Sequence, residues 1–309
     1  MRIGVVGAGL ADLERRAVAN GVPGLARLDR RGLAELEPHV RGVAALHSPR
    51  TAVVDFVAVA RVLLSDVQAA GGRVALGSPV LGVRDASDAV RVRTAVDEHA
   101  FDAVVRCAGL GTEPLARAAG VGGGARILPF RGQYHRLVPE RRHLVRGLVY
   151  PVSDPRYPFL GVHLTPRVDG EVLVGPNALL ALAREGYRPW DVSARDLRDM
   201  LTWPGTAHLV RRHWRAGLTE LPGAVSRRWF ARAARRYVPA LSADDLLPAQ
   251  SGIRAQAVDR GGRLLDDFAV QVAGRVVLVR NAPSPAATSS LAIARHLVRE
   301  FVGPTLQRR

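Results

Sequence analysis

The chain has 309 residues, of which 48% are hydrophobic, and its formal net charge is +16. This length and composition indicate a folded protein with a large core and exclude a disordered chain. No apolar run reaches about 18 residues, and the N-terminus lacks a secretory pattern. We therefore expect a cytoplasmic protein, either free or peripheral at the inner face of the membrane.

The inventory of reactive side chains excludes several kinds of chemistry. Cys107 is the sole cysteine and all 44 basic residues are arginine. Intramolecular disulfides, cysteine-cluster metal sites, Schiff-base chemistry and a Walker-type lysine are therefore excluded. The sequence contains no His-x-x-x-His pair and no Gly-x-Ser-x-Gly motif, so we expect no metal site and no serine hydrolase.

The positive charge has two interpretations. Arginines spread along the whole chain, which favours an ordinary arginine-rich surface and no nucleic-acid partner. They are densest in residues 209–237, where Trp214, Trp229 and Phe230 are interleaved. This segment is either a pair of helices facing a membrane or two solvated helices with buried aromatic rings.

The N-terminus begins like a nucleotide-binding unit. Residues 2–6 predict a buried strand and residues 11–20 a helix, with Gly7 and Gly9 in the turn between them. Such glycines let backbone amides approach a pyrophosphate. However, Asp12 stands where a third glycine is expected, and Asp29 lies in no apolar strand that could hold a ribose. The turn therefore belongs either to a dinucleotide site or to an ordinary buried βα unit.

Further elements follow in chain order. Asp55 and Gly71 predict the start and the end of a helix, after a loop-rich stretch that reaches about residue 53. The later segments are predicted from their periodicity and from their Gly and Pro residues. They are short strands at 73–76, 79–83 and 89–94, a strand at 101–109, a helix from about Thr112, antiparallel strands across 127–174, helices across 193–237 broken at Pro204 and Pro222, a strand at 251–259, a hairpin at 267–281, and a helix from about Ala287.

Several polar residues lie in apolar, strand-like surroundings. Arg254 and Arg131 need anionic partners there, because burying an unpaired charge is costly. For Arg254 the partner is either a substrate carboxylate or one of the nearby acids, Asp259, Asp266 and Asp267. His163 alternates with apolar residues and is either a packed core residue or a base.

Two small-residue turns could let a ligand approach the backbone. Cys107, Ala108 and Gly109 follow a strand, and the alternative is an ordinary turn with a buried cysteine. Asn281, Ala282, Pro283 and Ser284 precede the last helix. They form either a ligand-binding loop or a rigid surface loop.

Together these stretches resemble the FAD-dependent oxidoreductases of the D-amino-acid-oxidase type, and more narrowly the L-2-hydroxyglutarate oxidase/dehydrogenase group. The resemblance rests on DAVVRCAGLGTE, ILPFRGQYHRLVPERRHLVRGLVYPV, PFLGVHLTPRVDGEVLVGPNALLALAREGYR, SGIRAQAVD and NAPSPAATSSLAIA. It implies an α/β fold with an FAD-binding Rossmann-like domain, residues 1–125 plus 250–309. It also implies an antiparallel substrate domain, residues 126–249.

The resemblance also implies roles for residues. Hydride would pass from a 2-hydroxy acid, most specifically L-2-hydroxyglutarate, to FAD, and oxygen or a quinone-linked acceptor would reoxidise the flavin. His163 is the candidate base, and Arg254, Arg131 and Tyr134 are candidates for binding a carboxylate. The predicted FAD contacts are Gly7, Gly9, Cys107, Ala108, Gly109, Asn281, Ala282, Pro283 and Ser284.

The sequence departs from the family pattern at Leu10–Ala11. A block of many tens of residues is missing there, and the family's second strand and other cofactor contacts lie in that block. The resulting FAD domain would be incomplete. Two hypotheses follow: a working FAD-dependent enzyme, or a non-catalytic family member with weak or no FAD binding.

Overall fold

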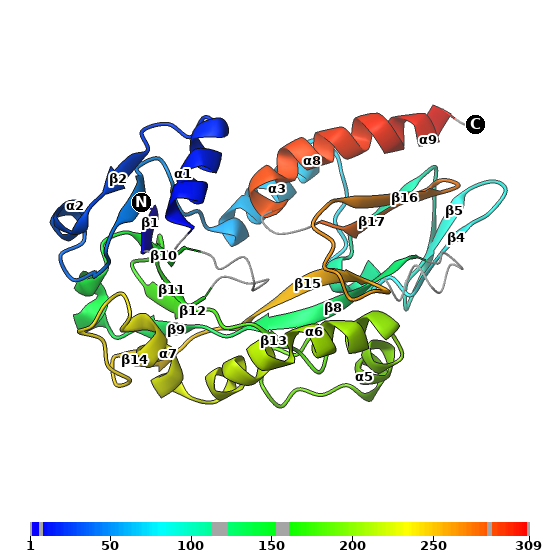
Figure 1. The fold of residues 1–309 in the computed structure, drawn as a ribbon. Helices are drawn as coiled ribbons and strands as arrows, with labels where there is room; N and C mark the ends of the chain where they lie inside the picture. The colour runs from blue at the N-terminus through cyan, green and yellow to red at the C-terminus, as the bar shows by residue number, and fades with distance from the viewer. Residues whose placement is uncertain (1, 6–8, 113–122, 153–160, 283–285, 308–309) are drawn as a thin grey trace.

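A computed structural model describes residues 2–5, 9–112, 123–152, 161–282 and 286–307. It is an α/β protein whose strands form one large and three small sheets. In Figure 1, α5, α6 and α7 line the lower side of the molecule, while α3, α8 and α9 form its upper side. Within the described ranges, no helix is both long and apolar enough to cross a membrane.

The large sheet combines three N-terminal strands with five strands from the middle of the chain. Its order is β14-β9-β12-β11-β10-β1-β3-β2. The strands are β1 (Arg2–Val5), β2 (Ala26–Leu28), β3 (Ala45–Ser48), β9 (His135–Leu137), β10 (Leu148–Pro151), β11 (His163–Pro166), β12 (Val172–Gly175) and β14 (Leu246–Pro248). Strand β1 runs parallel to β10 and antiparallel to β3, so the first strand of the chain lies inside this sheet.

One face of the large sheet carries the main core. Alternate strand residues such as Val149, Leu164 and Val174 are fully buried there, as the two-residue period of a strand requires. They pack with Phe230 of α7 (Arg227–Ala234) and Leu33 of α2 (Arg30–Leu36). Tyr150 and His163 are strand neighbours of Val149 and Leu164 and therefore lie on the opposite face.

A second sheet extends from the first and is covered by helices. Its order is β13 (Leu179–Leu180), β8 (Ala125–Gly132) and β15 (Gly252–Asp259). Leu128, Phe130 and Val258 point to one face and pack with Met200 of α5 (Ala194–Leu201) and Leu209 of α6 (Pro204–Glu220). The helices α5 and α6 thus lie against one side of this sheet only.

Two small sheets make up the other end of the molecule. One has the order β16 (Ala269–Ala273), β17 (Val276–Asn281) and β7 (Val104–Arg106), with β7 parallel to β17. The other is the meander β4 (Gly82–Asp85), β5 (Val90–Arg93) and β6 (Glu98–Phe101). The two sheets pack through a small cluster of valines with Leu278 and Ala273.

Two helices begin and end close to where the sequence predicts. The Asp55 carboxylate accepts hydrogen bonds from Val57 and Ala58 at the start of α3 (Phe56–Ala69), and Gly71 has a φ of +82° just after it. The last helices are α8 (Ser290–Leu297) and α9 (Gly303–Gln307). Helix α1 (Leu10–Ala19) is followed by Gly21 with a φ of +65°.

Most of the other predicted elements are confirmed, with four differences. Residues 73–76 form no strand, and of the strand predicted at 101–109 only β7 forms, while Phe101 ends β6. The stretch before Val53 is less irregular than expected because it contains β2, α2 and β3. The strands of the middle segment are antiparallel as expected, but β10 also pairs in parallel with β1. The helix predicted after Thr112 falls in residues 113–122, outside the described ranges.

Candidate active site

Arg131 is a buried cation near the end of β8. Only 5% of it is exposed, and its Nε atom has no hydrogen-bond partner among the described residues. Burial lowers the pKa of the guanidinium, and Asp191 opposes that shift. Arginine nevertheless stays charged in proteins. A buried guanidinium with open hydrogen-bonding capacity is suited to binding a carboxylate.

Arg254 lies on the neighbouring strand but on the opposite face. In the antiparallel register, Ile253 is opposite Arg131, and Arg254 is opposite Phe130. Directly opposite residues share a face, so Arg254 lies on the face where Phe130 meets the helices. Burial lowers the pKa of Arg254, and Asp266 opposes the shift. The structure therefore does not bring the two predicted carboxylate ligands together on one face.

Tyr134 follows β8 and occupies space left by a glycine. A Cβ atom on Gly175 would lie 3.2 Å from the Tyr134 ring and 2.8 Å from the Gln133 carbonyl oxygen. Gly175 also has a φ of +138°, so a larger residue would be strained there. Burial, helped by Tyr150, raises the pKa of Tyr134 to about 12. The phenol therefore remains a hydrogen-bond donor at neutral pH.

His163 pairs with Gly175 on the neighbouring strand and is therefore close to Tyr134. It stacks on Tyr150, with 4.1 Å between the ring centroids. Its Nδ1 atom is 3.1 Å from the Gly161 carbonyl oxygen. A carbonyl only accepts hydrogen bonds, so Nδ1 carries the proton and the lone pair of the neutral ring is on Nε2.

Tyr134, Tyr150 and His163 therefore gather on one face of the large sheet. That face is opposite the one packed against α7, because Val149, Leu164 and Val174 alternate with them and belong to the main core. Arg131 also lies on the face away from the helices of its sheet. The structure thus places Arg131, Tyr134 and His163 on the side of the sheets without α5, α6 and α7.

The predicted cofactor contacts form one partial group. Strands β7 and β17 are parallel, so Cys107–Gly109 and Asn281–Ala282 follow their carboxyl ends at the same edge of the sheet. Gly109 has a φ of +52° and open space around it, and Cys107 is exposed. The Asn281 amide donates to the carbonyls of Leu265 and Asp267, so it holds a neighbouring loop.

The glycine turn at the N-terminus is not part of that group. Gly9 precedes α1, and β1 before it lies in the large sheet rather than beside β7. Figure 1 shows β1 and α1 at the opposite end of the molecule from β16 and β17. Gly7, Pro283 and Ser284 lie outside the described residues.

Asp12 and Asp29, which do not fit the dinucleotide-binding pattern, both interact with other residues of the protein. Asp12 pairs with Arg15 at 3.0 Å and with Arg16 at 3.1 Å on the surface of α1. Asp29 caps α2, where its carboxylate accepts a hydrogen bond from the Gly32 amide. Neither acid is therefore positioned as a ribose ligand.

Arg106 is the polar residue that the sequence interpretation missed. It ends β7, is 5% exposed, and none of its three guanidinium nitrogens has a hydrogen-bond partner in the described part of the chain. Its signal was the one that singled out Arg254: an arginine within an apolar, strand-like run. Tyr150 was also missed, because a single tyrosine in a strand predicts no stacking partner.

The chain matches one protein family over nearly its full length. The model of the FAD-dependent oxidoreductase family, DAO, matches residues 5–300. The chain therefore belongs to the FAD-dependent oxidoreductases, as the resemblance indicated, and FAD is the cofactor of this family.

Within this family, the chain is similar to several L-2-hydroxyglutarate dehydrogenases. The chain is 42% identical over 305 residues to the mitochondrial L-2-hydroxyglutarate dehydrogenase of Nematostella vectensis, covering 93% of this chain and 67% of that protein. It is 39% identical to the mitochondrial enzyme of Homo sapiens, covering 94% and 66%. It is also 39% identical to an L-2-hydroxyglutarate dehydrogenase of Escherichia coli, covering 93% and 68%. The chain thus spans about two thirds of the length of these relatives.

Solved structures support the fold. An L-α-glycerophosphate oxidase from Mycoplasma pneumoniae, solved with FAD bound, superposes with a TM-score of 0.74 at 20% identity and covers 100% of this chain and 72% of that one. A glycine oxidase from Geobacillus kaustophilus gives a TM-score of 0.61 at 18% identity, covering 96% and 70%. The expected α/β fold of an FAD-dependent oxidoreductase with antiparallel sheets is confirmed.

The described residues fit FAD only in part. The carboxyl edge of β7 and β17 offers open backbone at Gly109. A dinucleotide site also needs its phosphate turn at the same edge of the same sheet, whereas β1 and Gly9 lie at the other end of the molecule. Within the described ranges, the residues therefore do not form a complete dinucleotide site.

Proposed function

We propose that this chain is an FAD-dependent oxidoreductase that converts L-2-hydroxyglutarate to 2-oxoglutarate. Supporting this are the 39–42% identity to three L-2-hydroxyglutarate dehydrogenases and the family match over residues 5–300. The reaction removes two electrons and two protons from the hydroxyl-bearing carbon and its oxygen. Bound FAD would supply the two-electron acceptor.

The single observation that carries the substrate class is the buried Arg131. A buried arginine whose Nε atom has no hydrogen-bond partner within the described ranges is costly unless an anion approaches it. A dicarboxylate such as L-2-hydroxyglutarate supplies that anion. Arg131 would bind one carboxylate through two parallel N–H···O bonds.

Arg254 is proposed to bind the second carboxylate. Gly132 and Gly252 are paired at the end of the β8–β15 ladder and carry no side chains. A Cβ atom on Gly252 would meet nothing within 4 Å, whereas one on Gly132 would lie 3.0 Å from Pro176. A substrate on the Gly252 side of this ladder end could meet Arg131 from one face and Arg254 from the other. One carboxylate for each arginine is consistent with a substrate that has two.

Tyr134 and His163 are proposed to act on the hydroxyl group. The Tyr134 phenol is a neutral donor and would orient the substrate oxygen. The Nε2 lone pair of His163 would take the hydroxyl proton, since Nδ1 is held by the Gly161 carbonyl. The stack on Tyr150 fixes the plane of the imidazole ring.

A second candidate function is favoured by the position of β1. A chain whose phosphate turn lies away from β7 would bind FAD weakly or not at all, and would be a non-catalytic member of the family. The visible spectrum separates the two candidates. The enzyme should carry flavin near stoichiometric occupancy, and L-2-hydroxyglutarate should bleach it without oxygen. A colourless protein that FAD does not change would leave only the second candidate.

The electron acceptor and membrane contact are separate parts of the proposal. Oxygen or a quinone-linked acceptor would reoxidise the flavin, and oxygen consumption distinguishes them. Phe230 is buried and the Trp229 indole donates to the Thr219 carbonyl, whereas Trp214 is 51% exposed. If this region contacts a membrane peripherally, binding to anionic vesicles should weaken with salt and with Trp214→Ala.

A further inference from the structure

An unpaired cation is buried between β7 and the β4–β6 meander. Arg106 is directly beside Leu278 in the parallel ladder. Leu278 and Val276 pack with Val83 and Val90, so this face of β7 and β17 looks toward the meander. Arg106 therefore lies on the side of its sheet that the meander covers.

Among the residues that the structure describes, nothing neutralises Arg106. Its Nε, Nη1 and Nη2 atoms are buried and have no hydrogen-bond partner within those ranges. Burial lowers the pKa of its guanidinium, and no neighbouring acid opposes the shift. Because arginine stays protonated even so, the buried positive charge remains uncompensated.

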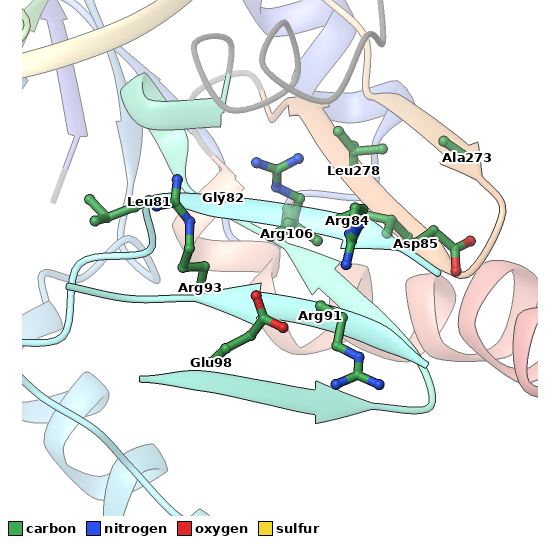
Figure 2. Close-up of a pocket in the computed structure, with 12 residues that line it drawn as sticks. Leu81, Gly82, Arg84, Asp85, Arg91, Arg93, Glu98, Arg106, Ala273 and Leu278 are labelled. Atoms are coloured by element: carbon green, nitrogen blue, oxygen red, sulfur yellow. The ribbon is translucent and has the colours of Figure 1, made fainter. Parts of the chain in front are cut away.

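Arg106 borders a cavity of about 550 Å³ that has both charged and apolar walls. This volume is within the range of small-molecule sites. The apolar lining includes Leu81, Val83, Val276 and Leu278, and the cationic lining includes Arg84, Arg91, Arg93 and Arg106. Figure 2 shows Arg93 and Arg106 extending to the same side of β4.

Gly82 explains how Arg93 reaches that position. A Cβ atom on Gly82 would lie 3.8 Å from the Nε and Nη2 atoms of Arg93, so the arginine passes over the glycine. This is an ordinary van der Waals distance. The chain thus brings an exposed guanidinium from β5 across β4 toward the buried one on β7.

The acids around the cavity are mostly engaged elsewhere. Asp85 accepts hydrogen bonds from the amide and the Nε atom of Arg275, at 2.8 and 2.9 Å. Asp88 pairs with Arg91 at 2.5 Å. Glu98 is opposite Arg93 in the ladder, but the described residues show no ion pair between them. Arg84, Arg93 and Arg106 therefore form an excess of positive charge.

We propose that this cavity binds a small organic diphosphate, with Arg106 and Arg93 binding its phosphate groups, while Arg84 at the rim adds positive charge. Guanidinium forks match phosphate oxygens, and burial strengthens the contact with Arg106. Leu81 and Leu278 provide an apolar wall for the organic part. This site does not depend on the proposed reaction. A free nucleotide and the ADP half of FAD share this chemistry.

Inorganic pyrophosphate and ADP are the probes for the test, with adenosine as the uncharged control. Both anions should raise the melting temperature of the purified full chain in a concentration-dependent way, and adenosine should not. Arg106→Leu should abolish this rise. Without any probe, the same variant should be at least as stable as the parent chain, because it removes an uncompensated buried charge.

Surface variants keep the test valid if Arg106→Leu fails to fold. Arg93→Gln should weaken pyrophosphate binding by roughly 5-fold, and Glu98→Gln should tighten it by roughly 2-fold, as expected for exposed charges. Arg211→Gln on α6, also an exposed arginine, should change nothing. If pyrophosphate and ADP leave the parent chain unchanged, or if the Arg93 and Glu98 variants bind pyrophosphate as the parent does, the site is refuted.

Competition then identifies the source of the diphosphate. If FAD displaces ADP from the parent chain, the cavity holds the cofactor's ADP half. If FAD and ADP bind together, the cavity is a separate nucleotide site. Both results retain the diphosphate site and both can be read by calorimetry, without any catalytic assay. Failure of L-2-hydroxyglutarate to bleach flavin would refute the proposed reaction but not this site.

Discussion

Arg131 and Arg254 lie on adjacent strands of one sheet, yet their side chains belong to opposite faces. The register pairs Arg131 with Ile253 and Phe130 with Arg254, so the two guanidinium groups cannot share one carboxylate within the sheet. Both are close to the ladder end at Gly132 and Gly252. The proposed two-carboxylate substrate would meet one of these cations on each face.

The first prediction concerns the proposal that Arg131 and Arg254 each bind a different carboxylate of the substrate. Arg131→Met and Arg254→Met should each raise KM for L-2-hydroxyglutarate by roughly 10- to 150-fold, the usual effect of losing hydrogen bonds to a charged group. L-2-hydroxypentanoate lacks the distal carboxylate. One of the two variants should therefore match the parent chain with this analogue, and steady-state kinetics would show which.

The control for this pair is the comparison of two substrates in the same variant. A folding defect would impair both substrates equally, whereas the loss of one carboxylate contact changes their ratio. If both variants keep the ratio of the parent chain, neither arginine discriminates the distal carboxylate and the division is wrong.

The second prediction concerns the protonation of Tyr134. Burial, with a smaller contribution from Tyr150, raises its pKa to about 12, so the phenol stays neutral up to about pH 11. Tyr134→Phe should lower kcat/KM by roughly 2- to 10-fold, because one neutral hydrogen bond is lost. The shape of the pH profile between about pH 7 and pH 10 should not change. An alkaline limb that disappears in the variant would contradict a neutral donor.

The third prediction links pH to stability through Asp245. Burial alone would raise the pKa of this carboxylate, but hydrogen bonds from Ser242 and Arg141 outweigh it, so its pKa is lowered. The stabilisation is therefore complete above the unfolded-state pKa of about 3.9 and is lost as pH falls through the lower folded-state value. Asp245→Asn should cost about 1–3 kcal/mol at neutral pH and less below about pH 4.

Asp244 is the matched control for this experiment. Its side chain is 89% exposed and meets Arg227 at 3.3 Å on the surface. Asp244→Asn should change the free energy of unfolding by less than about 0.5 kcal/mol at any pH, because exposed ion pairs contribute little. Denaturant titrations of the two variants across pH measure both values. Equal effects at neutral pH would show that the hydrogen bonds of Asp245 stabilise the fold no more than the exposed ion pair of Asp244.

The fourth prediction concerns the cap of α3. Asp55 accepts two backbone hydrogen bonds at the start of this helix, while no residue of α3 is buried. With so little packing, helix stability depends strongly on its cap. Asp55→Ala should speed amide exchange over residues 56–69 by roughly 5-fold, equal to about 1 kcal/mol. Asp66→Ala, at the other end of the same helix, should not.

Local signals in the sequence predicted local structure well. Asp55 and Gly71 define the ends of α3, because a cap and a left-handed glycine act within a few residues. The hairpin of β16 and β17 was predicted for the same reason, with Gly274 at a φ of +58° in its turn. Residues 73–76 show the limit: an apolar run without a pairing strand remains irregular.

The candidate site depended more on non-local pairing. The sequence indicated that Arg131 and Arg254 needed anions, but their faces follow from the register between β8 and β15, which no local pattern encodes. The contact between Tyr150 and His163 likewise requires β10 and β11 to be aligned. Arg106 carried the same signal as Arg254, but the cavity beside it exists only once the meander packs against β7 and β17.

The fifth prediction tests the position of β1, which decides whether the phosphate turn can reach the cofactor edge. Strand β1 pairs with β10 on one side and with β3 on the other, so it is an interior strand of the large sheet. Ile3→Pro removes a backbone donor, and proline is not tolerated in interior strands. Amide exchange should rise by at least about 10-fold at Leu148–Pro151 and Ala45–Ser48, and it should not change at Val104–Arg106.

Repeating this exchange experiment with FAD distinguishes the two candidate functions. If β1 stays in the large sheet with FAD present, Ile3→Pro should affect the same two strands and leave FAD affinity within about 2-fold of the parent chain. If FAD affinity falls by more than about 10-fold and exchange rises at Val104–Arg106, β1 must lie beside β7 when the cofactor binds. That outcome would overturn the strand order described above and would favour the working enzyme, because the turn at Gly9 would then reach the carboxyl edge of β7 and β17.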